Sequence, residues 1–109
     1  MKAKPVRPRE LAHRDVDEAI AYSLSRGAAE AALGFVDALE QAYRHIGSNP
    51  TTGSPRFAYE LDIPGLRCWP LARFPYLVFY VERQDHVDVW RVLHARRDIS
   101  AWMQEFQDS

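Results

Sequence analysis

The sequence predicts a single α+β domain in which an antiparallel helical hairpin covers a mostly antiparallel sheet. Apolar residues recur at steps of three and four along two segments of the first half of the chain, which is typical of amphipathic helices. Short β-branched and aromatic runs follow in the second half, which is typical of strands. The length of 109 residues suits one domain, and no linker-like stretch divides it. We therefore expect residues 1–109 to form one unit.

The N-terminal segment is expected to be a short strand followed by a helix. Residues Lys2–Arg7 should be extended, because Pro5 and Pro8 disfavour helix and Pro5 restricts a strand to the edge of a sheet. From Arg9–Ser25 the apolar residues return at helical spacing, and Gly27 then provides a stop signal.

The second helix is predicted over Ala28–Ile46, where the helical periodicity of the chain is strongest. It should end at Gly47–Pro50, because glycine and proline both oppose continuation of a helix. The short turn between the two helices makes them antiparallel neighbours that share a partner surface, which we expect to be the sheet. One stripe of this helix carries its apolar residues Ala32, Phe35, Val36, Leu39, Ala42, Tyr43 and Ile46.

Three strands are expected after a loop that spans Thr51–Pro64. The first, Leu66–Leu71, is interrupted by a proline, and the second, Tyr76–Val81, is a continuous apolar run suited to the middle of a sheet. The third, Val87–His94, alternates in the manner of a strand and follows a short polar turn. These segments give a three-stranded, mostly antiparallel sheet.

A short C-terminal helix should close the domain. Ile99, Trp102, Met103 and Phe106 have helical spacing, and Asp98 is a natural N-cap residue for a helix that begins there.

Composition excludes several classes of protein. The chain has 14 Lys+Arg and 15 Asp+Glu, so it lacks the bulk positive charge that attracts nucleic acid phosphates. No apolar run is long enough to span a membrane, and the N-terminus lacks the apolar stretch of a signal peptide. The single cysteine, Cys68, agrees with a reducing compartment, and we expect a cytoplasmic protein.

Candidate reactive side chains are sparse. The four histidines are scattered without metal-ligand spacing, so neither a metal site nor another cofactor is expected. Cys68 is interpreted as a small buried residue, since no histidine lies near it in the sequence. Asp15 and Glu18, one turn apart, are interpreted as part of a solvent-exposed helix face.

Arginines and aromatic residues gather on the expected strands and just after the last one, in 66–69, 91–94 and 96–98. Interleaved side chains of these types on a sheet could stack bases and hold RNA. Alternatively, the arginines pair with nearby carboxylates. The arginines concerned are Arg67, Arg91 and Arg97, and such carboxylates are Asp62, Asp88 and Asp98.

Four segments carry a family resemblance, and they follow the strand and helical hairpin in a fixed order. They read NPTTGSPR (49–56), PGLRCWPL (64–71), FPYLVFY (74–80) and RVLHARRDI (91–99). The most specific part is the end of the last strand, Arg-Val-Leu-His followed by Arg-Asp. Together these segments resemble the ParE branch of the ParE/RelE toxin superfamily over nearly the whole chain. The resemblance implies a RelE/ParE-like fold and the toxin of a type II toxin–antitoxin pair.

Two activities occur in that superfamily: ParE members inhibit DNA gyrase, whereas RelE members cut messenger RNA on the ribosome. RNA cleavage needs a base, an acid and cations that stabilise the phosphorane charge. RelE-like nucleases use cations on the middle strands and a tyrosine near the C-terminus. The matching positions here are Arg67, Trp69, Tyr76, Arg96 and Trp102. Only two cations remain, and an indole replaces the tyrosine. We therefore expect gyrase inhibition by binding, with no catalytic residue; the alternative is a RelE-like ribosome-dependent endoribonuclease with His94 as its base.

The resemblance also implies partners. A ParD-like antitoxin should cover an apolar groove of the toxin, and arginines beside the groove should meet its acidic residues. We expect no direct sequence-specific binding to nucleic acid. The antitoxin-binding residues expected are Arg67, Trp69, Arg73 and Arg91, and the residues expected to contact the target are Arg96, Arg97 and Trp102.

Overall fold

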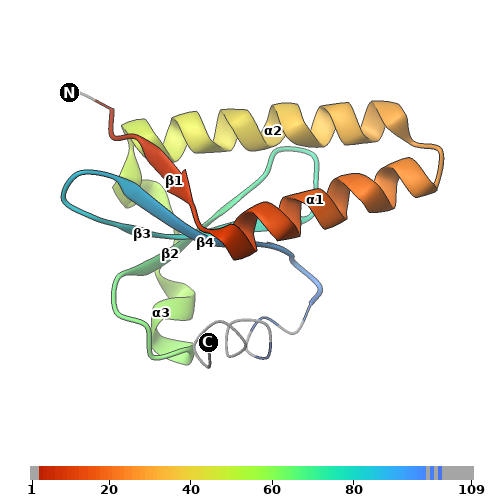
Figure 1. Ribbon diagram of the computed structural model, residues 1–109. Coiled ribbons are helices and arrows are strands. Elements are labelled where there is room, and N and C mark those ends of the chain that lie inside the picture. The colour runs from red at the N-terminus through yellow and green to blue at the C-terminus, as the bar shows by residue number, and fades with distance from the viewer. Residues whose placement is uncertain (1–2, 98, 100, 102–109) are drawn as a thin grey trace.

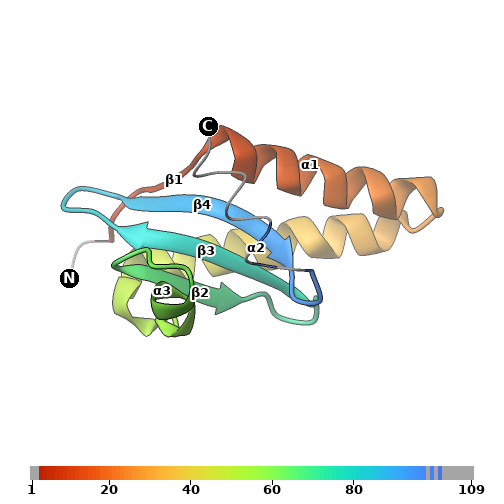
Figure 2. The same cartoon turned by 90° about the horizontal axis from the view of Figure 1, so that it is seen from below.

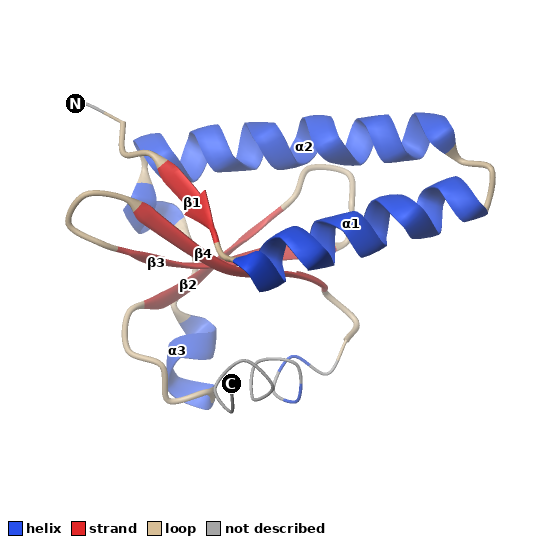
Figure 3. Cartoon of the chain, viewed as in Figure 1, coloured by secondary structure: helices blue, strands red, loops and turns tan. Residues whose placement is uncertain are grey.

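The computed structural model describes residues 3–97, 99 and 101 as an α+β fold in which two long helices lie on one face of a sheet (Figures 1 and 3). In chain order the elements are β1 (Val6–Pro8), α1 (Glu10–Ser25), α2 (Ala29–Ser48), the 3₁₀ helix η1 (Pro50–Thr52), α3 (Arg56–Glu60), β2 (Leu66–Pro70), β3 (Tyr76–Glu82) and β4 (Val87–His94). The predicted fold class and the antiparallel helical hairpin are confirmed.

The sheet has four strands in the order β1-β4-β3-β2 (Figure 2). Strands β2, β3 and β4 are antiparallel neighbours, as predicted, whereas β1 pairs in parallel with β4 over Val87–Val89. The sheet therefore has one strand more than the three expected, because the N-terminal segment joins it. Phe79 pairs with Arg91 and Tyr80 with Val89, so Trp90 is an extra residue that forms a bulge in β4.

The predicted apolar stripe of α2 packs on the sheet. Phe35, Leu39, Ala42 and Ile46 are all buried, and they form one core with Ala12 of α1 and the inward side chains of β3 and β4. Burying a side chain of this size contributes roughly 1.5–3 kcal/mol.

Helix α3 lies on the other face of the sheet from α1 and α2 (Figure 1). A second core of buried side chains lies between α3 and the sheet. Phe57 of α3 packs edge to face on Phe79, with ring centroids 5.3 Å apart. Cys68 is buried in this core, as the sequence suggested, and burial raises the pKa of its thiol although Arg56 opposes the shift.

The structure corrects two boundaries. The segment Thr51–Pro64, expected to be a loop, contains part of η1 and all of α3. Burial of Phe57 and Ile63 in the second core stabilises this segment. The first strand begins at Val6 and ends at Pro8, where Lys2–Arg7 was predicted; Lys2 lies outside the described residues. Ile99 is buried in the second core. The rest of the predicted C-terminal helix, with Asp98 and Trp102, lies outside the described residues.

Candidate functional site

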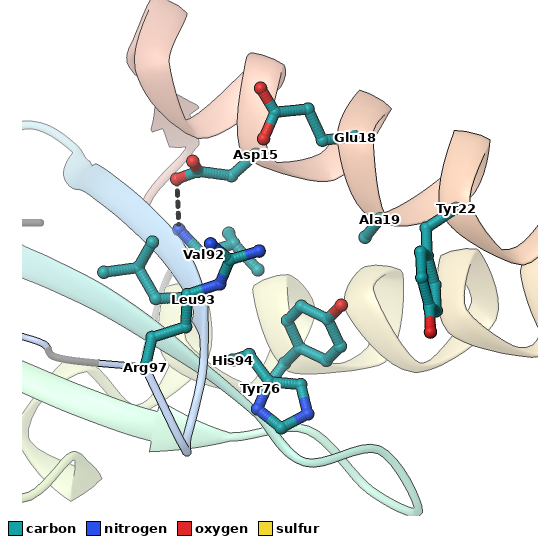
Figure 4. Close-up of a pocket in the computed structure, with 9 residues that line it drawn as sticks. All are labelled: Asp15, Glu18, Ala19, Tyr22, Tyr76, Val92, Leu93, His94 and Arg97. Carbon is teal, nitrogen blue, oxygen red and sulfur yellow. Dashed lines mark hydrogen bonds between the residues drawn. The ribbon is translucent and has the colours of Figure 1, made fainter.

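A cleft of about 420 Å³ opens between α1 and the C-terminal end of β4 (Figure 4). Its walls come from α1 on one side and from the start of β3, the end of β4 and the following turn on the other. The lining residues are Asp15, Glu18, Ala19, Tyr22, Tyr76, Val92, Leu93, His94 and Arg97.

A buried ion pair holds the α1 wall against the sheet. Arg91 donates from Nε and Nη2 to the two carboxylate oxygens of Asp15, at 2.8 and 2.7 Å. The backbone N–H of Val92 donates to Asp15 Oδ2 at 3.0 Å. Because β1 pairs with β4 only as far as Val89, no strand among the described residues covers the edge of β4 on which this N–H lies, and Asp15 supplies its acceptor.

This pair corrects two sequence-based placements. Asp15 is not on a solvent-exposed helix face, since only 8% of its surface is exposed. Arg91, at 2% exposure, is removed from the surface on which the sequence analysis placed it. Helical spacing alone could not show this, because the burial of Asp15 depends on where α1 crosses β4.

Pairing of Arg91 with a carboxylate was one of the two alternatives, and its partner is Asp15, whereas Asp88, named among the candidates, has other partners. Arg9 donates two hydrogen bonds to Asp88, at 2.8 and 2.7 Å, while Arg83 and the indole Nε1 of Trp90 bind Oδ2. Burial tends to raise the pKa of Asp88, but these donors outweigh it and the net pKa is lowered.

Two tyrosines face each other in the cleft. Tyr22 belongs to α1 and is 61% exposed, whereas Tyr76 lies at the start of β3 and packs beside His94 (Figure 4). Neither hydroxyl has a hydrogen-bond partner among the residues that the structure describes. Burial raises the pKa of Tyr76, the nearby Arg97 guanidinium opposes this, and the Tyr22 hydroxyl adds to it. Tyr76 therefore keeps its proton and remains a hydrogen-bond donor at neutral pH.

His94 has a defined role for one of its ring nitrogens. The backbone N–H of Arg96 donates to Nδ1 at 3.1 Å, so the neutral ring carries its proton on Nε2. The ring packs edge to face against Tyr76, with centroids 5.1 Å apart. His94 thus presents a donor, and not a base, in this arrangement.

Comparison with known proteins decides the family. A sequence profile described as "ParE toxin of type II toxin-antitoxin system, parDE" matches residues 6–99. The chain belongs to this ParE toxin family. Among solved structures, one chain titled "Chromosomal ParDE TA system from P. aeruginosa" has a similar fold, with a TM-score of 0.71 and 18% identity over 86% of this chain and 98% of that one. A search of curated proteins found no match.

Two residues expected to bind the antitoxin have internal contacts in this ParE-family fold. Arg67 donates from Nη1 to the carbonyls of Thr51 and Gly53, at 3.1 and 2.8 Å. Trp69 stacks on His45 of α2, with ring centroids 4.2 Å apart. Arg67 therefore holds the loop after α2, and Trp69 packs against the helix above it.

The other predicted residues are dispersed over the structure. Arg73 is exposed in the β2–β3 loop at a φ of 71° and lines a second cleft, of about 390 Å³, against Glu30 and Asp37 of α2. Arg96 and Arg97 are exposed after β4, and Arg97 lines the first cleft. The structure thus brings Arg97 together with His94.

Sequence reasoning missed the α1 side of the cleft. The one signal available was the spacing of Asp15, Ala19 and Tyr22, which places them on one face of a helix. Within residues 3–97, 99 and 101, no group of three potential metal ligands is present, and no helix is long and apolar enough to cross a membrane.

Proposed function

We propose that this chain is a cytoplasmic toxin that inhibits DNA gyrase by binding to it and is neutralised by a ParD-like antitoxin. The observation that carries the proposal is the match of residues 6–99 to the ParE toxin family, which is defined within the parDE system. The similar fold in a ParDE system from P. aeruginosa agrees with it.

The geometry of the described residues favours binding over RNA cleavage. Of the two cations left at the nuclease positions, Arg67 is engaged by loop carbonyls, so Arg96 is the exposed one. His94 accepts a hydrogen bond at Nδ1, and a neutral ring then has no open nitrogen with which to take a proton from a 2′-hydroxyl.

Two surfaces follow from this proposal. Arg96, Arg97 and Trp102 are the proposed contacts to gyrase, with Trp102 outside the described residues. For the antitoxin, Arg73 is exposed and Trp69 is partly exposed, so both remain proposed contacts.

A pair of assays tests the mechanism. Purified toxin should make gyrase accumulate cleaved DNA and should leave ribosome-bound messenger RNA intact. Substituting His94→Ala should preserve most of the inhibition, whereas Arg96→Gln with Arg97→Gln should weaken it through lost contacts. The alternative, a RelE-like endoribonuclease, would be established by ribosome-dependent cleavage of transcripts that His94→Ala slows strongly. Loss of a general base typically slows a reaction by roughly a hundred- to ten-thousand-fold.

A further inference from the structure

Several hydrogen-bond donors line the cleft between α1 and β4. The hydroxyls of Tyr22 and Tyr76, the Nε2–H of neutral His94 and the guanidinium of Arg97 all belong to its lining residues (Figure 4). Two of these donors, the tyrosine hydroxyls, are left without a partner by the described residues. Groups of this kind surround an oxyanion, because each donates to it and a guanidinium also offsets its charge.

The acidic side chains of α1 limit which oxyanion can enter. Asp15 is neutralised by Arg91, but Glu18 is exposed, has no ion pair within the described residues and lies on the α1 wall. The whole chain carries a formal net charge of -1, so it gives little long-range attraction to nucleic acid. Glu18 repels every anion, but a chain of phosphates carries several negative charges and a single carboxylate only one, so the carboxylate is opposed least.

We infer that this cleft receives the carboxylate of a single aspartate or glutamate of the cognate antitoxin. Tyr76 and Tyr22 donate to it from the two walls, and Arg97 pairs with it. The inference rests on the proposed function for the existence of that partner. This cleft lies apart from Arg67, which binds loop carbonyls, and it adds Tyr22 and Tyr76 to the surface proposed for the antitoxin.

An antitoxin carboxylate in this cleft would also affect binding to gyrase. Arg97 is also one of the proposed contacts to gyrase, and an antitoxin carboxylate paired with it would cover it. Antitoxin and gyrase would then compete for one guanidinium, and the toxin could not hold both partners through this site.

The test uses two tyrosine variants that each remove one hydroxyl. Tyr76→Phe keeps the ring that packs edge to face on Phe35 at 5.0 Å, so the fold should be retained, and a thermal melt checks this. Tyr59→Phe is the matched control, because Tyr59 is 95% exposed on α3 and does not line the cleft. Titration calorimetry with the purified antitoxin should give an affinity about tenfold weaker for Tyr76→Phe, since a hydrogen bond to a charged group is lost, and an unchanged affinity for Tyr59→Phe.

A second set of measurements identifies the occupant. Each antitoxin Asp or Glu is changed to its amide, and one such change should weaken binding to wild-type toxin yet lose most of its effect against Tyr76→Phe. The inference is overturned if wild-type toxin forms a complex whose affinity is the same for Tyr76→Phe and Tyr59→Phe, or if no acidic residue couples to Tyr76. It is also overturned if Tyr76→Phe weakens binding of a fluorescent RNA or DNA oligonucleotide but not of antitoxin. Failure of wild-type toxin to bind antitoxin at all would overturn the proposed partner as well.

Discussion

Two tyrosine–arginine pairs, at opposite halves of β3, differ in what surrounds them. Tyr80 donates to the carbonyl of Pro50 at 2.7 Å and accepts from the N–H of Gly53 at 3.0 Å, and Arg67 binds carbonyls of the same loop. Tyr76 and Arg97 instead face an open cleft, where the Tyr76 hydroxyl bonds to no described residue. A tyrosine hydroxyl is therefore structural at Tyr80, where a loop supplies its partners, and available to a binding partner at Tyr76, where no described residue does.

The largest expected effect is the loss of stability when the Asp15–Arg91 ion pair beneath the cleft is removed. Changing Asp15→Ala leaves Arg91 buried without its carboxylate and Val92 N–H without its acceptor. We expect a loss of about 3–5 kcal/mol in the free energy of unfolding, measured by urea denaturation. Asp17→Asn, an exposed neighbour outside the cleft, should change stability by less than about 0.5 kcal/mol. Equal stability of the two variants would show that the ion pair does not hold α1 on the sheet.

Removing one hydroxyl at a time tests the difference between the two tyrosines directly. Tyr80→Phe leaves the buried N–H of Gly53 and the Pro50 carbonyl without their partner, at a cost of about 1–3 kcal/mol in unfolding free energy. Tyr76→Phe removes a hydroxyl that has no described partner, and it should cost less than about 0.5 kcal/mol. A Tyr76→Phe variant as unstable as Tyr80→Phe would mean that the cleft hydroxyl is structural after all.

Gly53 shows how closely the loop fits its tyrosine. A Cβ at this position would clash with the Tyr80 hydroxyl oxygen and approach two carbons of its ring to 2.9 Å, so Gly53→Ala must displace the loop or the ring. Such overpacking typically costs about 1–3 kcal/mol. Combining Gly53→Ala with Tyr80→Phe removes the clashing oxygen, and thermal melts should show a loss smaller than the sum of the two single changes. Strict additivity would argue that the two residues are not in contact.

The sequence predicted the fold better than the roles of polar residues, for a physical reason. The stripe of α2 and the run of β3 are set by apolar periodicity, which local sequence records directly. Whether Asp15 is buried, or Arg67 internal, depends instead on contacts between segments far apart in the chain, such as Asp15 with Arg91 and Arg67 with Thr51. The cleft that Tyr22 and Tyr76 line also forms between segments far apart in the chain, so no local sequence pattern predicted it.

The smallest expected effect is on stability in alkaline solution, where tyrosine hydroxyls ionise. It tests whether burial raises the pKa of Tyr76 and Tyr80. Burial raises the pKa of Tyr76 and of Tyr80 above the value of about 10 that a tyrosine has in an unfolded chain. A raised pKa contributes stability that is fully present below about pH 10 and is lost as the pH rises through the folded-state value. Urea denaturation at a series of pH values should therefore show a shallower alkaline loss of stability for Tyr76→Phe and for Tyr80→Phe than for the wild type. Both variants should show this change although they differ at neutral pH, because burial is the largest cause of the raised pKa at each hydroxyl, whereas neutral stability depends on the partners that the loop gives to Tyr80. A wild-type slope retained in Tyr76→Phe would contradict the raised pKa of that hydroxyl.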